Sequence, residues 1–249
     1  MPDYAIIIPA YNEEALLPDT LVSVRDAMAG VPERQGEVIV SDNASTDGTA
    51  EVAAGHGARV VQEPHRQIAR ARNTGARHTD ADYLIFLDAD TLMSSVLLRQ
   101  TLAALDSGRI CAGGTCLSTA DGSGFKVRLA LATWHFLQRT MTWAAGSYVF
   151  CLREAFEAVG GFNEAFYASE EIILSNDLKR WGRGHQMSMK ILREPALTSM
   201  RKFEWYSTLD LVKLGLRLVI HPSDVKKRDA CPMWYQRPGS SGNSESTDS

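Results

Sequence analysis

The chain has 249 residues, of which 45% are hydrophobic and 22% are charged, and its formal net charge is −4. This composition is that of an ordinary globular protein, long enough to bury a large core without disulfide or metal staples. So mild a charge gives no reason to expect a nucleic-acid partner, and no segment has the roughly 18 uninterrupted apolar residues of a membrane span.

The N-terminal stretch MPDYAIIIPAYNEE has no basic region, and its apolar run is too short for a signal peptide. None of the four cysteines forms a C-x-x-C pair, which predicts buried, reduced thiols. We therefore expect a cytoplasmic protein, and peripheral contact with the inner face of a membrane stays an open alternative.

The first half of the chain alternates strand-like and helix-like patterns. Short apolar runs predict strands at Tyr4–Pro9, Glu37–Val40, Arg59–Gln62 and Tyr83–Leu87. Helical patterns lie between them: one opens at Pro18, one is capped by Ser45 or Thr46 and runs to about Gly55, and one covers Gln67–His78. Alternation of this kind predicts a parallel sheet with crossover helices.

The second half is less regular. It predicts helices at Lys126–Thr142, Glu154–Val159, Glu170–Trp181 and Thr208–Ile220, and a strand at Ser147–Leu152. Gly160 and Gly182 are expected to end the two middle helices. The tail from Pro238 is small and polar, which predicts disorder.

Polar residues follow each predicted strand of the first half. The segments are Ala10–Glu13, Ser41–Asn43, Glu63 and Asp88–Asp90. Ligands of open parallel sheets bind outside the carboxyl ends of the strands, so these residues predict a polar site above an apolar sheet.

Asp88 and Asp90 end a buried strand with two carboxylates. In extended backbone, the side chains at positions i and i+2 point to the same face of the strand. Two carboxylates at such a short distance repel each other unless a cation lies beside them. Mg²⁺ often takes one or two carboxylates together with substrate phosphates. The alternative is that the pair only caps the helix that starts near Ser94. The strand-end position favours the metal.

These segments together resemble the family 2 glycosyltransferases. The matching motifs are IIIPAYNEE at 6–14, VIVSDNASTDGT at 38–49, ARARNTGA at 69–76, YLIFLDAD at 83–90, REAFEAVGGFNEAF at 153–166 and SEEIILSNDLKRWG at 169–182.

The resemblance implies an α/β GT-A fold, with a Rossmann-like, mostly parallel sheet between helices and a smaller mixed sheet on the acceptor side. One domain would cover residues 1–225, with a nucleotide-binding half (1–110) and an acceptor or catalytic half (111–225). Residues 226–249 would be a C-terminal extension.

The resemblance also implies roles for the matching positions. The nucleotide-sugar site would contain Pro9, Ala10, Tyr11, Glu13, Asp42, Asn43, Arg72, Asn73, Asp88 and Ala89. Asp90, with Asp88, would bind Mn²⁺ or Mg²⁺ on the donor diphosphate. Arg201, in a basic segment, would close over that diphosphate.

An acidic pair at the start of a late helix would supply the base that deprotonates the acceptor. Here the pair is Glu170–Glu171, where many members of the family have Glu-Asp, and Glu171 is the candidate base with Glu170 as the alternative. Both glutamates would also suit the helix N-terminus through its dipole. A second departure is Ile173, at a position where the family often has Asp.

The implied function is metal-assisted, inverting transfer of a sugar from a nucleotide-diphosphate donor to a carbohydrate or lipid-linked hydroxyl. UDP is the favoured nucleotide and GDP the alternative. Two other functions stay open. A sugar nucleotidyltransferase would need a glycine-rich basic loop after the first strand, which PAYNEE does not provide. A catalytically silent nucleotide-sugar-binding module would accommodate the departures at Glu171 and Ile173.

Overall fold

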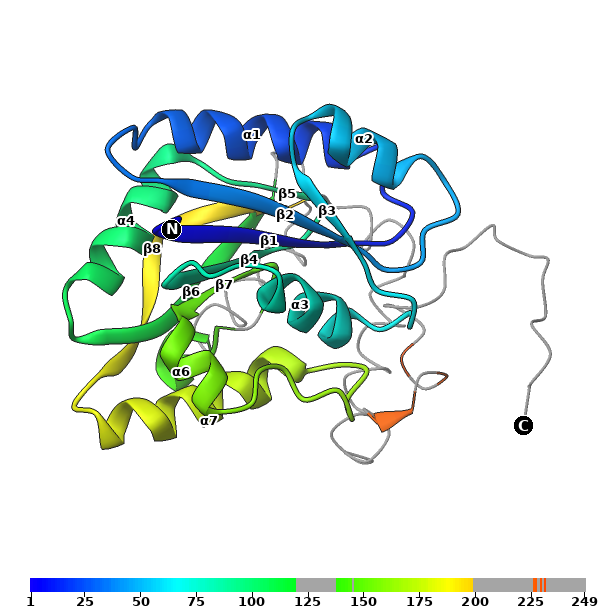
Figure 1. Ribbon diagram of the computed structural model, residues 1–249. Helices are drawn as coiled ribbons and strands as arrows, with labels where there is room; N and C mark the ends of the chain where they lie inside the picture. Colours follow the sequence, from blue (N-terminus) through cyan, green and yellow to red (C-terminus); the bar gives the residue numbers. More distant parts are fainter. Residues whose placement is uncertain (120–137, 145, 199–225, 228, 230, 232–249) are drawn as a thin grey trace. The chain divides into compact units, whose positions relative to one another are not determined.

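The structure, a computed structural model, describes residues 1–119, 138–144, 146–198, 226, 227, 229 and 231 (Figure 1). The chain divides into two compact units: Met1–Glu164 with Ser169–Ser199, and Ala165–Ala168 with Met200–Ser249. The helix expected at Thr208–Ile220, the tail, and residues 126–137 of the helix expected at Lys126–Thr142 lie outside the described residues.

The described part of the first unit is built on an eight-stranded sheet with the order β3-β2-β1-β4-β7-β6-β8-β5. The strands are β1 (Tyr4–Ala10), β2 (Gly36–Asp42), β3 (Arg59–Gln62), β4 (Tyr83–Leu87), β5 (Thr91–Leu92), β6 (Ile110–Thr119), β7 (Tyr148–Leu152) and β8 (Ser188–Thr198). The helices are α1 (Leu17–Ala29), α2 (Thr49–Gly55), α3 (Ile68–Arg77), α4 (Ser95–Asp106), α6 (Arg153–Ala158) and α7 (Glu170–Gly184).

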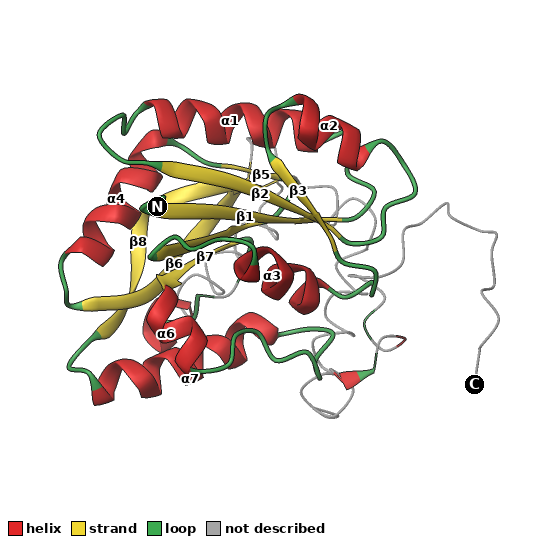
Figure 2. Ribbon diagram, viewed as in Figure 1, coloured by secondary structure: helices red, strands yellow, loops and turns green. Residues whose placement is uncertain are grey.

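Side chains alternate between the two faces of the sheet along each central strand, and both sets are buried. On β1, Tyr4, Ile6 and Ile8 pack in one hydrophobic cluster with residues of α1, α2 and α4. Ala5 and Ile7 point the other way, into a second cluster with residues of α3, α6 and α7. The result is a sheet with helices on both sides (Figure 2).

The parallel half of the sheet sets the position of the polar segments. Strands β3, β2, β1 and β4 are parallel, with Ala10 beside Asp42 and Asp42 beside Gln62 in the register. The carboxyl ends of these four strands therefore lie at one edge, on the right in Figure 1. This confirms the prediction of a parallel sheet whose strand-end residues share an edge.

The other half of the sheet is mixed. Strand β7 is antiparallel to both β4 and β6, whereas β6 and β8 are parallel to each other. The sequence did not predict β5, β6 or β8. Strands β6 and β8 carry register irregularities, and β6 contains two adjacent glycines, Gly113 and Gly114, so a simple alternating pattern is missing.

Two helix boundaries differ from the prediction. Helix α2 begins at Thr49 after Gly48, and Ser45 and Thr46 do not cap it, because they hydrogen bond to Asn12 instead. Helix α7 continues through Gly182 to Gly184. Gly182 allows close packing there, since a Cβ atom would lie 2.7 Å from Cys111 Sγ.

All four cysteines are free and buried, as predicted. Among the described helices, none combines the length and apolarity needed to cross a membrane. In the second unit, Ala168 and Cys231 are buried together with Tyr167 packed against them, and the Lys226 ammonium lies 5.1 Å from the ring centroid of Phe166.

Candidate active site

Three carboxylates meet on one buried arginine of α3. Nη1 of Arg72 donates to Glu170 Oε1 and to Glu171 Oε1, each at 2.9 Å, and Nη2 donates to Asp88 Oδ1, also at 2.9 Å. Arg72 is only 1% exposed. The arginine therefore connects the end of β4 to the start of α7.

Burial and charge shift the protonation of this cluster. Burial raises the pKa of Glu170 to about 8, and the charge of Glu171 adds to that rise while Arg72 opposes it. Burial alone would lower the pKa of Arg72, but the attraction of Glu171, Asp88 and Glu170 outweighs it and the net shift is upward. Burial therefore favours the neutral form of Glu170, and the single positive charge of Arg72 lies between Asp88 and Glu171.

The two members of the acidic pair differ in access to solvent. The side chain of Glu170 is 1% exposed, whereas that of Glu171 is 15% exposed and that of Asp88 is 17% exposed. Of the pair, Glu171 is the carboxylate that a ligand can reach. Ser169, directly before the pair, has a left-handed backbone with φ of 64°.

The segment after β4 is a turn. The Thr91 N–H donates to the Asp88 carbonyl at 3.1 Å, and the Asp88 N–H donates to the Ser147 carbonyl at 2.9 Å. The Thr20 hydroxyl on α1 donates to the Ala89 carbonyl at 2.8 Å. The expectation of extended backbone from Asp88 to Asp90 is therefore wrong, because the chain turns between them.

The capping alternative for the two aspartates is also wrong. Helix α4 is capped by Ser94, whose Oγ accepts from the Leu97 N–H at 3.0 Å. Asp88 directs its carboxylate to Arg72 instead. Asp90 is half-buried at the same turn.

The residues expected in the nucleotide site lie at the ends of β1 and β2. Pro9 and Ala10 are buried in β1. Asp42 and Asn43 are buried; Asp42 Oδ1 accepts from the Ser45 N–H at 3.2 Å, and Asn43 Oδ1 accepts from the Gln67 N–H at 3.2 Å.

Tyr11 and Glu13 begin the loop between β1 and α1. The Arg66 guanidinium carbon lies 3.8 Å from the centroid of the Tyr11 ring, so it stacks on that ring. The Glu13 N–H donates to Thr49 Oγ1 at 2.8 Å, which ties the loop to α2.

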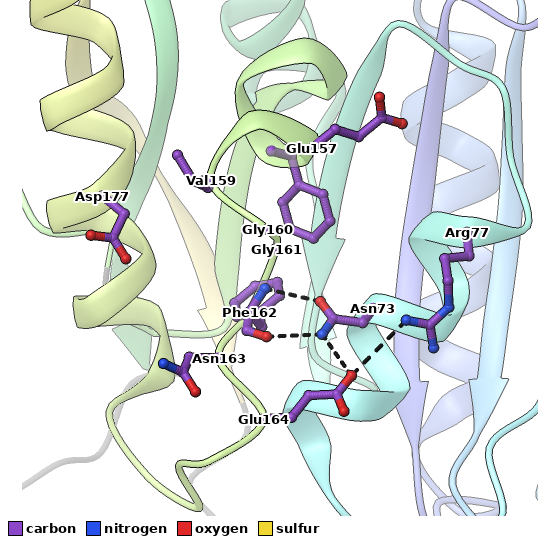
Figure 3. A pocket seen from close by; sticks show the side chains of 11 residues that line it. Asn73, Arg77, Glu157, Val159, Gly160, Gly161, Phe162, Asn163, Glu164 and Asp177 are labelled. Atoms are coloured by element: carbon purple, nitrogen blue, oxygen red, sulfur yellow. Dashed lines mark hydrogen bonds and ion pairs between the residues drawn. The ribbon is translucent and has the colours of Figure 1, made fainter.

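Asn73, expected near the nucleotide, is engaged elsewhere. Its Nδ2 donates to the Phe162 carbonyl at 2.9 Å and to Glu164 Oε1 at 3.0 Å, and its Oδ1 accepts from the Phe162 N–H at 2.9 Å (Figure 3). These contacts border a groove of about 530 Å³ that is also lined by Arg77 and Asp177. The structure thus gives Asn73 the role of fixing the loop between α6 and α7.

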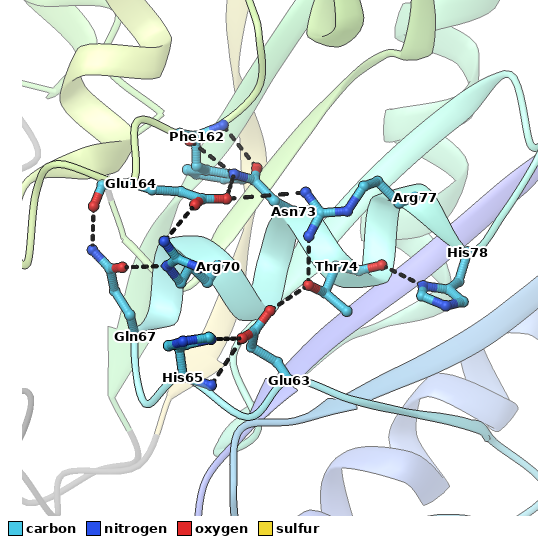
Figure 4. Close-up of polar contacts among 10 residues, drawn as sticks. All are labelled: Glu63, His65, Gln67, Arg70, Asn73, Thr74, Arg77, His78, Phe162 and Glu164. Atoms are coloured by element: carbon cyan, nitrogen blue, oxygen red, sulfur yellow. Dashed lines mark hydrogen bonds and ion pairs between the residues drawn. The ribbon is translucent and has the colours of Figure 1, made fainter.

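A further polar network fixes the N-terminal part of α3 (Figure 4). Glu63 Oε2 accepts from the Thr74 hydroxyl at 2.6 Å, and Oε1 accepts from the His65 N–H at 2.9 Å. The side-chain Nε2 of Gln67 donates to the Glu164 carbonyl at 2.6 Å. The strand-end residue Glu63 is therefore used to hold the helix that carries Arg72.

The described residues contain no group of three or more His, Cys, Asp or Glu side chains arranged to hold a metal ion. Asp88 and Asp90 supply two carboxylates at one turn, a donor set that fits a hard cation whose other ligands come from a diphosphate and water. Arg201 lies outside the described residues.

Sequence reasoning missed the residues that support this site. The Ser147 carbonyl and the Thr20 hydroxyl bind the turn after β4, and the Phe162 ring contacts Arg72. Each of these contacts joins residues far apart in the chain. Only Phe162 carried a signal, because it belongs to the motif at 153–166.

The family model described as "Glycosyl transferase family 2" matches residues 5–160. The chain belongs to this family, which confirms the resemblance drawn from the motifs. Over 103 residues it is 37% identical to an uncharacterised glycosyltransferase of Mycobacterium tuberculosis, covering 41% of this chain and 44% of that protein. The match therefore spans less than half the length of that relative.

Solved structures with the same fold include GT-A glycosyltransferases. The mannosyltransferase PcManGT from Pyrobaculum calidifontis, in complex with GDP-Man and Mn²⁺, has a TM-score of 0.65 at 19% identity, covering 90% of this chain and 64% of that one. TarS from S. aureus, in complex with UDP, has a TM-score of 0.61 at 15% identity, covering 89% and 65%. The fold is therefore GT-A, as the motifs implied.

Proposed function

We propose that this chain transfers a sugar, with inversion and with help from a divalent cation, from a nucleotide-diphosphate donor to an acceptor hydroxyl. One observation carries the proposal. Arg72 holds Glu171 of α7 and Asp88 after β4 on the same guanidinium group, so the candidate base and the donor-side carboxylate face one site.

The donor would occupy the carboxyl edge of the parallel strands. Asp42 and Asn43 would present polar groups for the nucleobase there, and Tyr11, whose ring stacks with Arg66, would supply an aromatic face. The ribose and diphosphate would lie toward Asp88 and Asp90, whose turn is anchored by Thr20 and by the Ser147 carbonyl.

Glu171 would act on the acceptor. Its carboxylate accepts the proton of the acceptor hydroxyl while that oxygen forms a bond to the anomeric carbon, and the bond from this carbon to the diphosphate oxygen breaks on the opposite face. The exposure of Glu171 supports this role, because burial favours the neutral form of Glu170, which has no comparable access.

Asp90, with Asp88, would hold Mn²⁺ or Mg²⁺. When bound, such a cation stabilises the negative charge that develops on the leaving diphosphate. Arg72 fixes the carboxylate of Asp88 in position, and Asp90 lies at the same turn.

UDP and GDP are both compatible with an acidic residue facing the nucleobase. Structural neighbours were solved with each: TarS with UDP and PcManGT with GDP-Man. We favour UDP and a carbohydrate or lipid-linked acceptor. Peripheral membrane contact would suit a lipid-linked acceptor, and the helix expected to make it, Thr208–Ile220, lies outside the described residues.

The test begins with thermal-shift measurements against UDP, GDP and their sugars, with and without Mn²⁺. The nucleotide that stabilises the protein only with Mn²⁺ identifies the donor, and its sugars are then assayed for hydrolysis and transfer. Glu171→Gln should reduce transfer at least about a hundredfold and leave donor affinity unchanged. Glu154→Gln is the matched control, because Glu154 is an exposed glutamate in the first turn of α6.

Two outcomes would count against the proposal. Normal transfer by Glu171→Gln would remove Glu171 as the base. Tight donor binding with neither hydrolysis nor transfer across acceptors would favour the catalytically silent nucleotide-sugar-binding module.

A further inference from the structure

We infer that Arg72 is a positioning residue that links the donor side of the site to the acceptor side, fixing the carboxylates of Asp88 and Glu171 relative to each other. The inference rests on the proposed function and assigns to Arg72 a task different from contact with the nucleotide. It follows from the geometry of one buried side chain.

The guanidinium group is shared between two distant parts of the chain. Among the described residues, Nη2 binds Asp88 at 2.9 Å, whereas Nη1 binds Glu170 and Glu171, both at 2.9 Å. A planar fork of this kind sets the relative position of its partners, because both nitrogens belong to one rigid group. Asp88 and Glu171 are 83 positions apart in the sequence, and this side chain bonds to both.

Arg72 cannot reach a phosphate in this arrangement. Its side chain is 2% exposed, and its bonding nitrogens Nη1 and Nη2 are directed at carboxylates. Nε is buried and has no hydrogen-bond partner among the described residues. An arginine committed in this way is suited to hold other groups and is poorly placed to bind a ligand.

The guanidinium group of Arg72 also contacts an aromatic ring. Its carbon lies 5.1 Å from the centroid of the Phe162 ring, which is a cation–π distance. Phe162 is fixed in turn by Asn73, the residue that follows Arg72 on α3. Two consecutive residues of α3 thus work together. Arg72 binds the carboxylates, and Asn73 fixes the loop that carries Phe162, the aromatic contact of Arg72.

The chemical consequence concerns Glu171. A base must lie within hydrogen-bond distance of the acceptor hydroxyl, and misplacement by about 1 Å can reduce the rate about a hundredfold. Glu171 is partly exposed, so Arg72 is what fixes its carboxylate relative to Asp88. A lysine would keep the positive charge but would bind as a point charge and lose the two-sided fork.

The first test measures stability and does not need activity. Asp88→Asn, Glu171→Gln and the double variant are compared by thermal unfolding, in the wild-type and Arg72→Lys backgrounds. With Arg72 present, we expect the loss in Tm of the double variant to differ from the sum of the single losses, because one rigid fork binds both carboxylates. In the Arg72→Lys background the losses should become nearly additive.

The second test uses the active protein and separates binding from chemistry. Arg72→Lys should lower kcat about tenfold to a hundredfold, while the Kd of UDP with Mn²⁺, measured by calorimetry, changes less than about threefold. Arg72→Gln should lower kcat further. Arg70→Gln is the matched control: Arg70 is on the same helix and binds Gln67 and Glu164, so kcat should stay at the wild-type value.

The outcomes distinguish failure of the positioning role of Arg72 from failure of the proposed function. Additive Tm losses in both backgrounds, or a loss of donor affinity as large as the loss of kcat, would overturn the positioning role. A wild-type protein that neither binds nor turns over any nucleotide sugar would instead overturn the proposed function, and the unfolding measurements would still decide whether Arg72 links the two carboxylates.

Discussion

Asn73 and Phe162 are joined by a two-way hydrogen bond between a side-chain amide and a backbone. Asn73 Oδ1 accepts from the Phe162 N–H, and Asn73 Nδ2 donates to the Phe162 carbonyl, both at 2.9 Å (Figure 3). Only an amide side chain offers a donor and an acceptor in this arrangement. The contact fixes the loop between α6 and α7 on α3, next to the carboxylate cluster.

We predict that Asn73→Asp destabilises the protein by about 2–4 kcal/mol. The carboxylate would lose the donor that binds the Phe162 carbonyl and would lie beside Glu164, which Nδ2 also contacts. Urea unfolding gives the free energy. Asn176→Asp is the control, because the exposed Asn176 side chain accepts a hydrogen bond from Trp143 Nε1, which a carboxylate also does. Equal stability of both variants would show that the contact contributes nothing.

Glu170 should make the stability depend on pH. Its pKa is raised from 4.5 in the ordinary state to about 8 in the folded protein, so the folded state binds more protons than the unfolded state between these values. Its contribution is fully present below about pH 4.5 and is lost as the pH rises through 8. Glu170→Gln, which cannot ionise, should therefore gain stability relative to wild type across this window, by roughly 1–3 kcal/mol at pH 8.5.

Unfolding of both proteins from pH 5 to pH 8.5 measures this difference. Glu154→Gln, on the exposed side of α6, should follow the wild-type curve throughout. Parallel curves for wild type and Glu170→Gln would mean that Glu170 is ionised in the folded protein.

Asp90→Asn should weaken the binding of UDP in the presence of Mn²⁺ at least about tenfold, because a neutral amide is a weaker ligand for a hard cation. Without Mn²⁺ the two proteins should bind UDP alike. Calorimetry with and without the metal measures both values, and Asp82→Asn, at an exposed aspartate before β4, should have no effect. A loss of affinity of the same size without metal would assign Asp90 to the nucleotide itself.

Gly75→Ala should destabilise the protein by about 1–3 kcal/mol through overpacking, although alanine favours helices. A Cβ atom at this position would lie 2.4 Å from Ile7 Cγ2, so α3 would have to move away from β1. Ile7→Ala removes that methyl group, and in its background the added cost of Gly75→Ala should shrink. An unchanged cost would place the strain elsewhere. Gly55→Ala, where no atom lies within 4 Å, is the control.

The first half of the fold could be predicted from local pattern. Strands β3 and β4 have the predicted bounds, whereas β1 and β2 run past theirs, β1 to Ala10 and β2 from Gly36 to Asp42. Strands β1 and β4 are buried along nearly their whole length, so each is a nearly continuous apolar run that polar residues end. The edge strand β3 is short, and of its four residues only Val61 is buried. Strands β5, β6 and β8 gave no such run, because they belong to the mixed part of the sheet and their pairing partners are remote in sequence.

The sequence by itself determined the family, the parallel half of the sheet and the set of polar residues at its edge, because hydrophobic period and strand-end chemistry are local properties of the chain. Only the tertiary structure decided which of these residues meet. Arg72, which the sequence placed near the nucleotide, bonds to Asp88, Glu170 and Glu171, and the chain turns between Asp88 and Asp90. The bonds of a buried charge depend on which other groups are buried with it, and packing between distant segments sets that.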